Sequence, residues 1–559
     1  MHLGKFAIAL GAAVSIAAPP AAQPAGTGPT PNRAPLQALK YTELPLGAVR
    51  PEGWLRQQLL TMANGATVHL DEFYAKLRDD YGWLNGKGNN WEETPYWLYN
   101  QTGEQPLLRL GDLLTQQNTP WTALLGGRDW AINTAANQTG DHWMDRHGVN
   151  AGQGLKLPVV RHQATGESQD AQALRTGWQD LMTLQGLSMG IFSADEDLHG
   201  NLPTQGVELC AIVETMYSLE QAIATTGDPL YMDALERMTY NALPTQTTDD
   251  FLNRQYFQVA NQVQVKRGVS DSSRPFDRGM NNVFGPYAGY TCCTANQHQG
   301  WTKFTSHPWY GTPSGGVAAL EYAPKVLANT VAGNVPLTVR EDTNYSFEDQ
   351  IRFTIETRKP ATFPLALRIL AWCEQATIRL NSKTLRTEKG SQEFNLNQAW
   401  HNQHLLTLEL PMRLTTSRWA HNSRAVELGP LVYAPNLPYT QTKGTAKEEC
   451  DYYEYLPAAP WNYGLERATV EHPAQNLTIT RQSFQPNLAG SPWNPERAPQ
   501  NHRHWPSHPR LATRQRCCPP ASNRPQWCVQ GYSRPGSLEV HPYSLWLHQA
   551  ADGGLSGGK

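Results

Sequence analysis

The pattern of apolar residues changes sharply along this 559-residue chain at the turn-forming stretch Pro313-Ser314-Gly315-Gly316. Before it, apolar residues recur every three or four positions, the spacing of helices that bury one face. After it, short apolar runs alternate with turn signals, which is typical of strands. The length exceeds one ordinary domain. We therefore predict a multidomain protein, mainly α and then β, in which a helical toroid or barrel precedes a β-sandwich.

The clearest helix signal begins at Cys210. Apolar residues step by three and four from there to Ile223, and Gly227-Asp228-Pro229 is a stop signal. A second helix, residues 231–243, follows at once. Antiparallel helix pairs divided by such stops favour a toroid or barrel. Further helical segments are expected at residues 53–62, 70–77, 107–114 and 149–164.

The second half carries the strand signals. Its runs have the length and composition of strands and are separated by turns such as Asn381-Ser382. Regular spacing of this kind is typical of a sandwich. The expected strands are residues 317–322, 335–339, 351–355, 365–371, 376–380, 405–410 and 424–433.

The N-terminus has the order of a secretory signal. Lys5 precedes the apolar run 6–18, and a small-residue and proline-rich stretch follows at 17–26. The run is too short to span a bilayer comfortably. We expect residues 1–25 to be a signal peptide, the mature protein to be periplasmic or extracellular, and no membrane association after cleavage.

These signals divide the rest of the chain into four parts. We assign 26–312 to the helical barrel, 313–440 to the β-sandwich, and 441–498 to a linker with partial strands. Residues 499–559 are rich in Arg, Pro, His, Ser and Trp and lack periodic aliphatic residues, so we expect a disordered tail. A shifted reading frame is one hypothesis for this tail, and resequencing the 3′ end would test it.

The composition excludes some partners. The net charge of −3 and the charged fraction of 17% do not indicate a nucleic-acid or anionic-membrane partner. The 18 Trp and 22 Tyr residues suit the flat faces of sugars, but such rings also fill ordinary cores.

The cysteines do not form a disulfide pattern, although exported proteins usually pair them. Cys292 and Cys293 are adjacent, and a bridge between neighbours is strained. Together with Cys210 and Glu208 they form a plausible four-ligand set for Zn²⁺. Glu208 and Cys210 cannot share one helical face, but they could converge where the chain enters the helix, just after Gly206. The alternative is that these cysteines are inert, buried small residues.

Several motifs resemble glycoside hydrolase family 127. They are Glu208-Leu209-Cys210-Ala211-Ile212-Val213-Glu214, Gly227-Asp228-Pro229-Leu230-Tyr231, Asn241-Ala242-Leu243-Pro244, Cys292-Cys293-Thr294-Ala295-Asn296 and Gly300-Trp301-Thr302-Lys303-Phe304. The resemblance extends over about residues 45–433. It implies an (α/α)6 barrel followed by β-sandwich domains, and a β-L-arabinofuranosidase-like enzyme acting on an oligosaccharide or plant-type glycan.

The resemblance also implies roles for the motif residues. Glu208, Cys210, Cys292 and Cys293 would hold zinc, and Cys292 would be the nucleophile. Zinc lowers the pKa of a thiol, so a thiolate would exist at neutral pH. Coordination would also protect the thiols from oxidation in an exported protein.

A retaining glycosidase needs a general acid that later serves as a base. The family supplies it from a glutamate upstream of the Glu-x-Cys motif, a place that Ser193-Ala194-Asp195-Glu196-Asp197 occupies here. We choose Glu196 among these three acids. Like-charged neighbours would raise the pKa of one carboxyl, as an acid catalyst requires. The alternative is a solvated acidic loop.

Sugar contacts are expected from four further residues. His147 lies in Arg146-His147-Gly148-Val149-Asn150, which resembles the family segment with a substrate-contacting histidine. Trp97, in an aromatic stretch, is expected at the barrel mouth, and His298 and Gln299 follow the cysteine pair. Any of them could serve packing alone.

The sequence also departs from the family pattern. The stretch between Trp97 and His147 is shorter, Asn118-Thr119-Pro120-Trp121 has the character of a junction, and a second substrate histidine has no clear counterpart. The barrel domain is therefore expected to be abbreviated. Three rival interpretations stay open: a decayed or non-catalytic carbohydrate-binding protein, a polysaccharide lyase, and a glycosidase fold with purely structural zinc.

Overall fold

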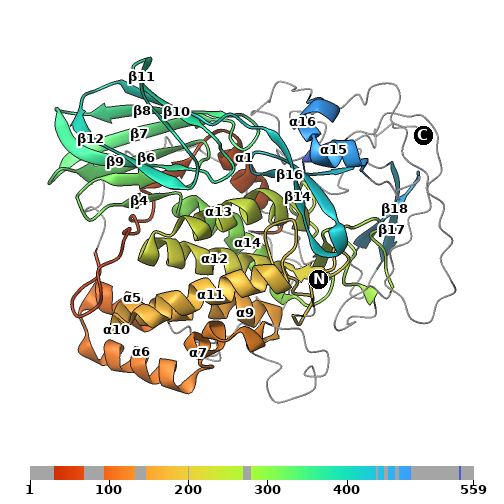
Figure 1. The fold of residues 1–559 in the computed structure, drawn as a ribbon. Coiled ribbons are helices and arrows are strands. Elements are labelled where there is room, and N and C mark those ends of the chain that lie inside the picture. Colours follow the sequence, from red (N-terminus) through yellow and green to blue (C-terminus); the bar gives the residue numbers. More distant parts are fainter. Residues whose placement is uncertain are drawn as a thin grey trace, which may run out of the picture.

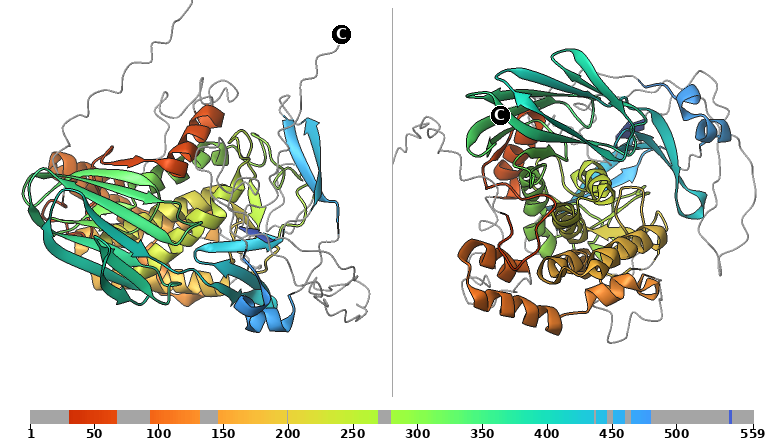
Figure 2. Two further views of the ribbon diagram at one scale, coloured as in Figure 1. Left: turned by 90° about the horizontal axis from the view of Figure 1, so that it is seen from above. Right: turned by 60° about the vertical axis from the view of Figure 1, so that its left-hand side comes forward.

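The computed structural model describes residues 31–67, 93–131, 146–198, 200–268, 279–435, 438–445, 451–459, 465–479 and 540–542. Helices fill the first half of the described chain and β-sheets the second (Figure 1). Figure 1 and the right-hand view of Figure 2 show the sheets of residues 317–409 above the helices. The predicted order, a helical barrel region followed by a β-sandwich, is confirmed. The predicted signal peptide, residues 1–25, lies outside the described residues.

The helical region is built around α12 (Leu209–Thr226), most of whose residues are buried. It packs against α9 and α14, and its last turn ends at Gly227, whose φ of 67° lies in the left-handed region. Asp228 then caps α13 by accepting a hydrogen bond from the Leu230 backbone. The stop signal of the sequence is therefore a helix cap followed by a new helix start. The described α-helices of this region are α1 (Gly53–Met62), α5 (Glu93–Thr102), α6 (Gln105–Gln117), α7 (Trp121–Gly126), α9 (Gly148–Gly154), α10 (Leu157–Thr165), α11 (Ser168–Leu184), α12, α13 (Pro229–Arg237) and α14 (Cys292–Ser306).

Two sheets form the sandwich. The larger has the strand order β1-β6-β7-β8-β13-β10-β11 and the smaller β12-β9-β5-β4. Alternate residues of β8, including Ile351, Phe353 and Ile355, are buried, and they share one core with Leu365 and Leu367 of β9. The strand bounds are β1 (Val49–Pro51), β4 (Trp309–Gly311), β5 (Val317–Ala319), β6 (Lys325–Val331), β7 (Val335–Thr343), β8 (Gln350–Thr357), β9 (Ala361–Ile369), β10 (Ala376–Leu380), β11 (Lys383–Glu388), β12 (Gln392–Trp400) and β13 (His404–Glu409).

Two strands of the sandwich come from the part of the chain that the sequence assigned to the barrel. β1 pairs antiparallel with β6, and β4 pairs with β5. Both strands are three residues long, so neither has enough alternating positions to be recognised from sequence.

A buried charged network joins the helices to the sandwich. Arg368 of β9 is 2% exposed and forms ion pairs with Glu321, with Asp233 and with Glu236, the last two on α13. Removing one partner of such a network leaves an uncompensated buried charge, which costs about 3–5 kcal/mol. The network therefore fixes α13 against β9.

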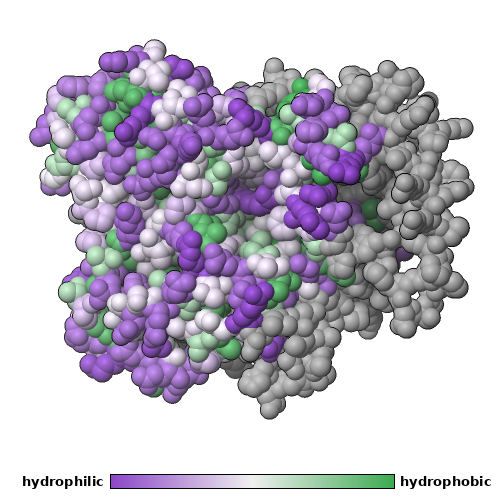
Figure 3. All heavy atoms as spheres, viewed as in Figure 1, coloured by the Kyte–Doolittle hydropathy of each residue, from purple (hydrophilic) through white to green (hydrophobic). Residues whose placement is uncertain are grey.

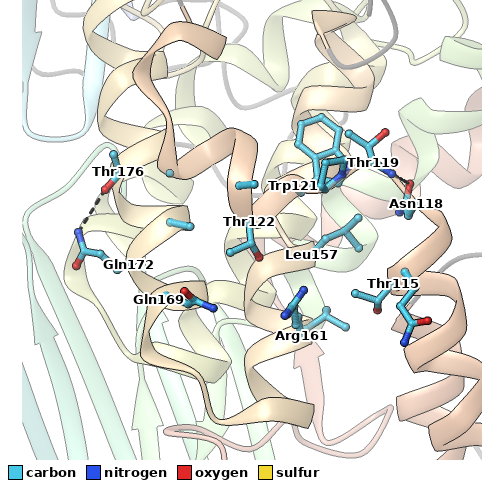
Figure 4. Close-up of a pocket in the computed structure, with 16 residues that line it drawn as sticks. Thr115, Asn118, Thr119, Trp121, Thr122, Leu157, Arg161, Gln169, Gln172 and Thr176 are labelled. Carbon is cyan, nitrogen blue, oxygen red and sulfur yellow. Dashed lines mark hydrogen bonds between the residues drawn. The ribbon is translucent and has the colours of Figure 1, made fainter.

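A groove of about 690 Å³ opens between the end of α6, α7, α10 and α11. Its wall includes Asn118, Thr119 and Trp121, the residues that the sequence marked as a junction (Figure 4). None of the predicted site residues lines it. α6 ends at Gln117 and α7 begins at Trp121, so the predicted junction coincides with this groove in the helical layer.

The chain after the sandwich forms smaller elements. β14 (Leu414–Arg418), β15 (Arg424–Leu428), β16 (Leu431–Pro435) and β19 (Val540–Pro542) make a further sheet, and β17 (Tyr439–Thr445) pairs with β18 (Asp451–Pro457). The short helices α15 (Arg467–Glu471) and α16 (Pro473–Asn476) follow. Of the predicted tail, 499–559, only 540–542 lie within the described residues. Among the helices of the described part, none combines the length and apolarity needed to cross a membrane.

Candidate metal and active site

Glu208 and Cys210 stand on either side of the start of α12. Glu208 ends the short strand β2 (Gly206–Glu208) in an extended conformation, with φ −68° and ψ 138°, and Cys210 lies in the first helical turn. Because the backbone changes direction between them, both side chains can reach one point, as the sequence predicted. β2 pairs with β3 (Phe257–Val259), and the Glu208 backbone donates a hydrogen bond to the Ala194 carbonyl. Three distant segments therefore meet at Glu208.

The cysteine pair begins α14 and completes this cluster. The Sγ atoms of Cys210 and Cys293 are 3.2 Å apart, far longer than the about 2.05 Å of a disulfide. The thiols of Cys292 and Cys293 lie 3.5 Å and 3.4 Å from the Glu208 carboxylate. Cys210, Cys292 and Cys293 are all free, and of the three only Cys292 is exposed. Cys292 is therefore the one cysteine of the cluster that lies at the surface.

The four side chains fit a metal ion. One ligand atom from each of Glu208, Cys210, Cys292 and Cys293 lies within 4.8 Å of every other. The second carboxylate oxygen of Glu208 is buried and has no hydrogen-bond partner among the described residues. Such an orphaned oxygen costs about 1–3 kcal/mol or more unless a cation or donor satisfies it. The donor set can therefore bind a metal, and its soft sulfur atoms exclude Mg²⁺ and Ca²⁺ as preferred ions.

The electrostatics of the cluster also favour a cation. Burial raises the pKa of Glu208, and it raises the pKa of Cys210 and Cys293 as well. Hydrogen bonds from Cys210 and Cys293, aided by the charge of Arg254, lower the pKa of the Cys292 thiol to about 3. Four adjacent acidic groups oppose one another's ionisation. A bound divalent cation would remove that opposition.

Glu196 lies beside the cluster and is held from two sides. One carboxylate oxygen accepts a hydrogen bond of 2.6 Å from the Tyr256 hydroxyl, and the other lies 3.2 Å from Nε2 of His147. Oxygen atoms of Glu196 and Glu208 and a ring nitrogen of His147 lie within 4.8 Å of one another. The backbone of Glu196 has a φ of 82°, a conformation that costs a non-glycine residue about 1–3 kcal/mol. Strain of this kind gathers at functional sites.

The neighbours of Glu196 are buried as well. Asp195 is fully buried and accepts a hydrogen bond from the Gly206 backbone, and Asp197 is 2% exposed. The alternative of a solvated acidic loop is therefore wrong. Among these acids, Glu196 alone joins His147 and Glu208 in a cluster of ligand-type atoms within the described residues.

A close backbone approach positions His147. The Gly148 backbone donates a 2.6 Å hydrogen bond to the Glu196 carbonyl, just after His147 and at the start of α9. A Cβ atom on Gly148 would lie 2.3 Å from the Cβ of Ala194, so only glycine fits. The predicted sugar-binding histidine and the predicted acid are thus adjacent.

The other predicted sugar contacts are placed differently. His298 lies on α14, and its Nδ1 is 2.7 Å from the Thr67 hydroxyl, while its buried Nε2 has no hydrogen-bond partner in the part of the chain that the structure describes. Gln299, also on α14, donates a 2.5 Å hydrogen bond to Asn296. Trp97 is 56% exposed on α5, and no described contact joins it to the cluster. The geometry therefore supports a role for His298 more than one for Trp97.

Sequence reasoning missed Arg254 and Tyr256. Tyr256 binds Glu196, and its ring meets that of Tyr290 edge-on with centroids 5.9 Å apart. Arg254 is 1% exposed and donates hydrogen bonds around the cysteine pair. Both residues are brought to the site by β3 and the turn before it, and no spacing in the sequence connects them to the cysteines.

Two family models match the chain in the order of its two regions. One describes a β-L-arabinofuranosidase GH127 catalytic domain and matches residues 55–306, and the other describes the GH127 middle domain and matches 316–412. The chain belongs to glycoside hydrolase family 127. As a GH127 member it is a glycosidase, and the cysteine–glutamate cluster lies within its catalytic domain.

Solved structures share the GH127 fold. A chain described as a glycoside hydrolase is 16% identical with a TM-score of 0.53, and the match covers 77% of this chain and 97% of that one. A GH127 β-L-arabinofuranosidase from Geobacillus stearothermophilus T6 is 19% identical with a TM-score of 0.51, covering 68% of this chain and 67% of that one. Identities this low support the fold alone. None of the curated proteins compared with the chain matches it.

Proposed function

We propose that this GH127 chain is a retaining glycosidase that removes a non-reducing-end sugar, with a β-L-arabinofuranoside as substrate. The observation that carries the proposal is the exposed thiol of Cys292 in one cluster with Glu208, beside the doubly held carboxyl of Glu196. A retaining mechanism needs a nucleophile and an acid–base residue of this kind. The sugar is inferred from the family description, and the substrate would be an oligosaccharide or plant-type glycan.

The reaction would take two steps. In the first, the Cys292 thiolate forms a bond to the anomeric carbon as the glycosidic bond breaks, and protonated Glu196 gives its proton to the departing oxygen. In the second, Glu196 takes a proton from water, the water oxygen attacks the anomeric carbon, and the sulfur leaves as a thiolate. Tyr256 and His147 would hold Glu196 in position throughout.

We propose Zn²⁺ as the metal, bound by Glu208, Cys210, Cys292 and Cys293. Three sulfur ligands and one carboxylate suit zinc. The ion would supply positive charge that allows Cys210 and Cys293 to be deprotonated together with Cys292 at neutral pH. The orphaned Glu208 oxygen supports the fit.

We propose His147 and His298 as sugar contacts, with Gln299 as a weaker candidate. His147 adjoins Glu196, and the unpartnered Nε2 of His298 is free to bond a sugar hydroxyl. Burial lowers the pKa of His298 to about 4, so its ring is neutral at pH 7 and offers one donor and one acceptor.

The test compares two cysteine variants on a panel of nitrophenyl glycosides that includes the β-L-arabinofuranoside. Cys292→Ser should lower kcat at least about 10³-fold, the scale of losing a nucleophile. Cys373→Ser is the matched control, because Cys373 is free and buried in the sandwich. Zinc content and melting temperature are measured on the same samples.

Four outcomes would contradict the proposal. Near-normal turnover by Cys292→Ser would show that Cys292 is not the nucleophile. Sugar binding by the wild type without cleavage indicates a carbohydrate-binding protein, and an unsaturated product indicates a lyase. Loss of zinc with unfolding of Cys292→Ser, instead of a loss of rate in a folded protein, indicates a structural metal.

We also propose export, because residues 1–25, the predicted signal peptide, have the order of a secretory signal. Expression of the full chain in a bacterial host, followed by N-terminal sequencing of the periplasmic or secreted protein, tests it. A mature N-terminus near residue 26 is expected, and an intact Met1 in cytoplasmic protein would contradict export.

A further inference from the structure

Two arginines in the described part of the chain are among the largest fully buried side chains, and they have opposite surroundings. Arg368 is paired with Glu321, Glu236 and Asp233. Arg254, 1% exposed, has no ion pair with a carboxylate within the described residues. Its guanidinium donates instead to neutral oxygens: the hydroxyl of Thr294 and the carbonyls of Ala288 and Tyr290.

A buried cation without an anionic partner is costly, by several kcal/mol per ion. Negative charge near Arg254 must therefore come from another source. The guanidinium bonds the Thr294 hydroxyl, one position after Cys293, and the Tyr290 carbonyl, two positions before Cys292, so its charge lies beside the cysteine–glutamate cluster. Three thiolates and one carboxylate carry more negative charge than one divalent ion neutralises. The loaded cluster is thus the anion that matches this cation.

The hydrogen bonds of Arg254 also enclose the cysteine pair. The carbonyls of Ala288 and Tyr290 come just before Cys292, and the Thr294 hydroxyl comes just after Cys293. Thr294 in turn donates a 2.9 Å hydrogen bond to the Pro286 carbonyl. One planar fork therefore fixes the chain on both sides of the two sulfurs, a geometry that lysine cannot reproduce.

We infer that Arg254 is the positioning residue of the metal–thiolate centre: it fixes the turn that leads into α14, where Cys292 and Cys293 lie, and it balances the excess negative charge of the loaded cluster. The inference rests on the proposed function. Arg254 has no described contact with a ligand atom, so it acts through the cysteines. Partners of this kind, one shell beyond the metal, change metal affinity by about 10–100-fold when they are replaced.

The test uses Arg254→Met, which removes charge and fork, and Arg254→Lys, which keeps the charge and loses the fork. Zinc affinity is measured by competition with a chromophoric chelator, and the thiolate-to-metal absorption bands are recorded after Co²⁺ substitution. Arg254→Met should weaken zinc binding about 10–100-fold. Arg254→Lys should recover part of that affinity but keep altered cobalt bands, because the turn is no longer fixed.

Arg368→Lys is the matched control, since it alters a buried arginine outside the cluster. It should lower the melting temperature while zinc affinity and cobalt bands stay as in the wild type. Wild-type zinc affinity and wild-type cobalt bands in both Arg254 variants would overturn the inference. If Arg254→Met does not fold, the cobalt bands of Arg254→Lys alone test the inference: altered bands support it and wild-type bands overturn it. A wild-type chain that binds no zinc refutes the proposed function instead, so the two failures are distinguishable.

Discussion

The sulfurs of Cys210 and Cys293 lie 3.2 Å apart, although 83 positions separate them in the chain. The contact exists because α12 and α14 begin at the same place and pack along their length. Gly300 permits this packing, since a Cβ there would lie 2.6 Å from a methyl carbon of Leu243 and 3.3 Å from one of Val213. The relative position of two helix starts thus determines the site.

Replacing Glu196 should reveal its part in leaving-group departure. Glu196→Gln cannot donate a proton, so turnover of an alkyl or sugar glycoside should fall about 10²–10⁴-fold. Nitrophenyl glycosides should lose less in the first step, because nitrophenolate leaves with little protonation. Steady-state kinetics on both substrate types check this, with Glu104→Gln as an exposed control. Equal losses on both substrates would argue against acid catalysis.

Removing the metal should destabilise the protein as well as inactivate it. Our proposal has zinc bind the folded cluster, and at a free concentration of 100 times Kd such binding contributes about 2.7 kcal/mol. Dialysis against a chelator should lower the melting temperature, and stepwise addition of Zn²⁺ should restore it together with activity. Scanning fluorimetry and metal analysis measure both. A chelated sample with unchanged melting temperature and turnover would contradict a zinc site.

His307 should make stability depend on pH. Burial alone would lower the pKa of its ring, but Glu220, 3.0 Å away, and Glu43 raise it well above the usual value. A folded-state pKa raised in this way stabilises the fold below the unfolded value of about 6.5 and loses that contribution as pH rises through the folded pKa. Melting temperature should therefore decline on the alkaline side of pH 6.5.

Two variants test this assignment of the pH dependence. His307→Gln should melt lower than the wild type at pH 6, and its melting temperature should decline less over the alkaline range. His401→Gln, on an exposed turn, should follow the wild type. The rings of Tyr217 and Tyr310 also face His307. If the melting temperature of His307→Gln declined with pH as steeply as that of the wild type, the pH dependence would come from other groups.

Gly148→Ala should displace the Glu196 carboxyl without changing the carboxyl group itself. The added Cβ would meet the Cβ and Cα of Ala194 at 2.3 Å and 2.7 Å, so the backbone before Glu196 must shift. Overpacking costs about 1–3 kcal/mol, and a small displacement of a catalytic group can reduce the rate about 10²-fold. Melting temperature and kcat are the readouts. Wild-type kcat would mean that this close approach does not position Glu196.

The sequence predicted the parts of the site that depend on patterns among neighbouring residues. The helix from Cys210 to its stop at Gly227 follows from periodicity, and the convergence of Glu208 with Cys210 follows from their place at a helix start. The alternation in β8 likewise identifies its buried face. The cysteine pair was recognised because adjacent thiols rarely form a disulfide.

The remaining features depend on contacts between distant segments. Arg254 and Tyr256 precede a three-residue strand, and only the folded chain brings them to Thr294 and Glu196. Trp97 was expected at the barrel mouth because aromatic rings suit sugars, but no described contact takes it to the cluster. An aromatic residue in sequence indicates possible chemistry and does not give a location.

The pairing of β1 with β6 has a consequence for how the chain matures. Residues 49–51 form the edge of a sheet whose next strand, Lys325–Val331, is made only after the whole catalytic domain. During synthesis β1 cannot pair until β6 has been made. The pairing then closes a long loop of chain that contains all the helices between the two strands. The catalytic domain therefore cannot reach its final shape before the sandwich exists, so truncation after residue 312 should leave it incomplete even though all the cluster ligands are present.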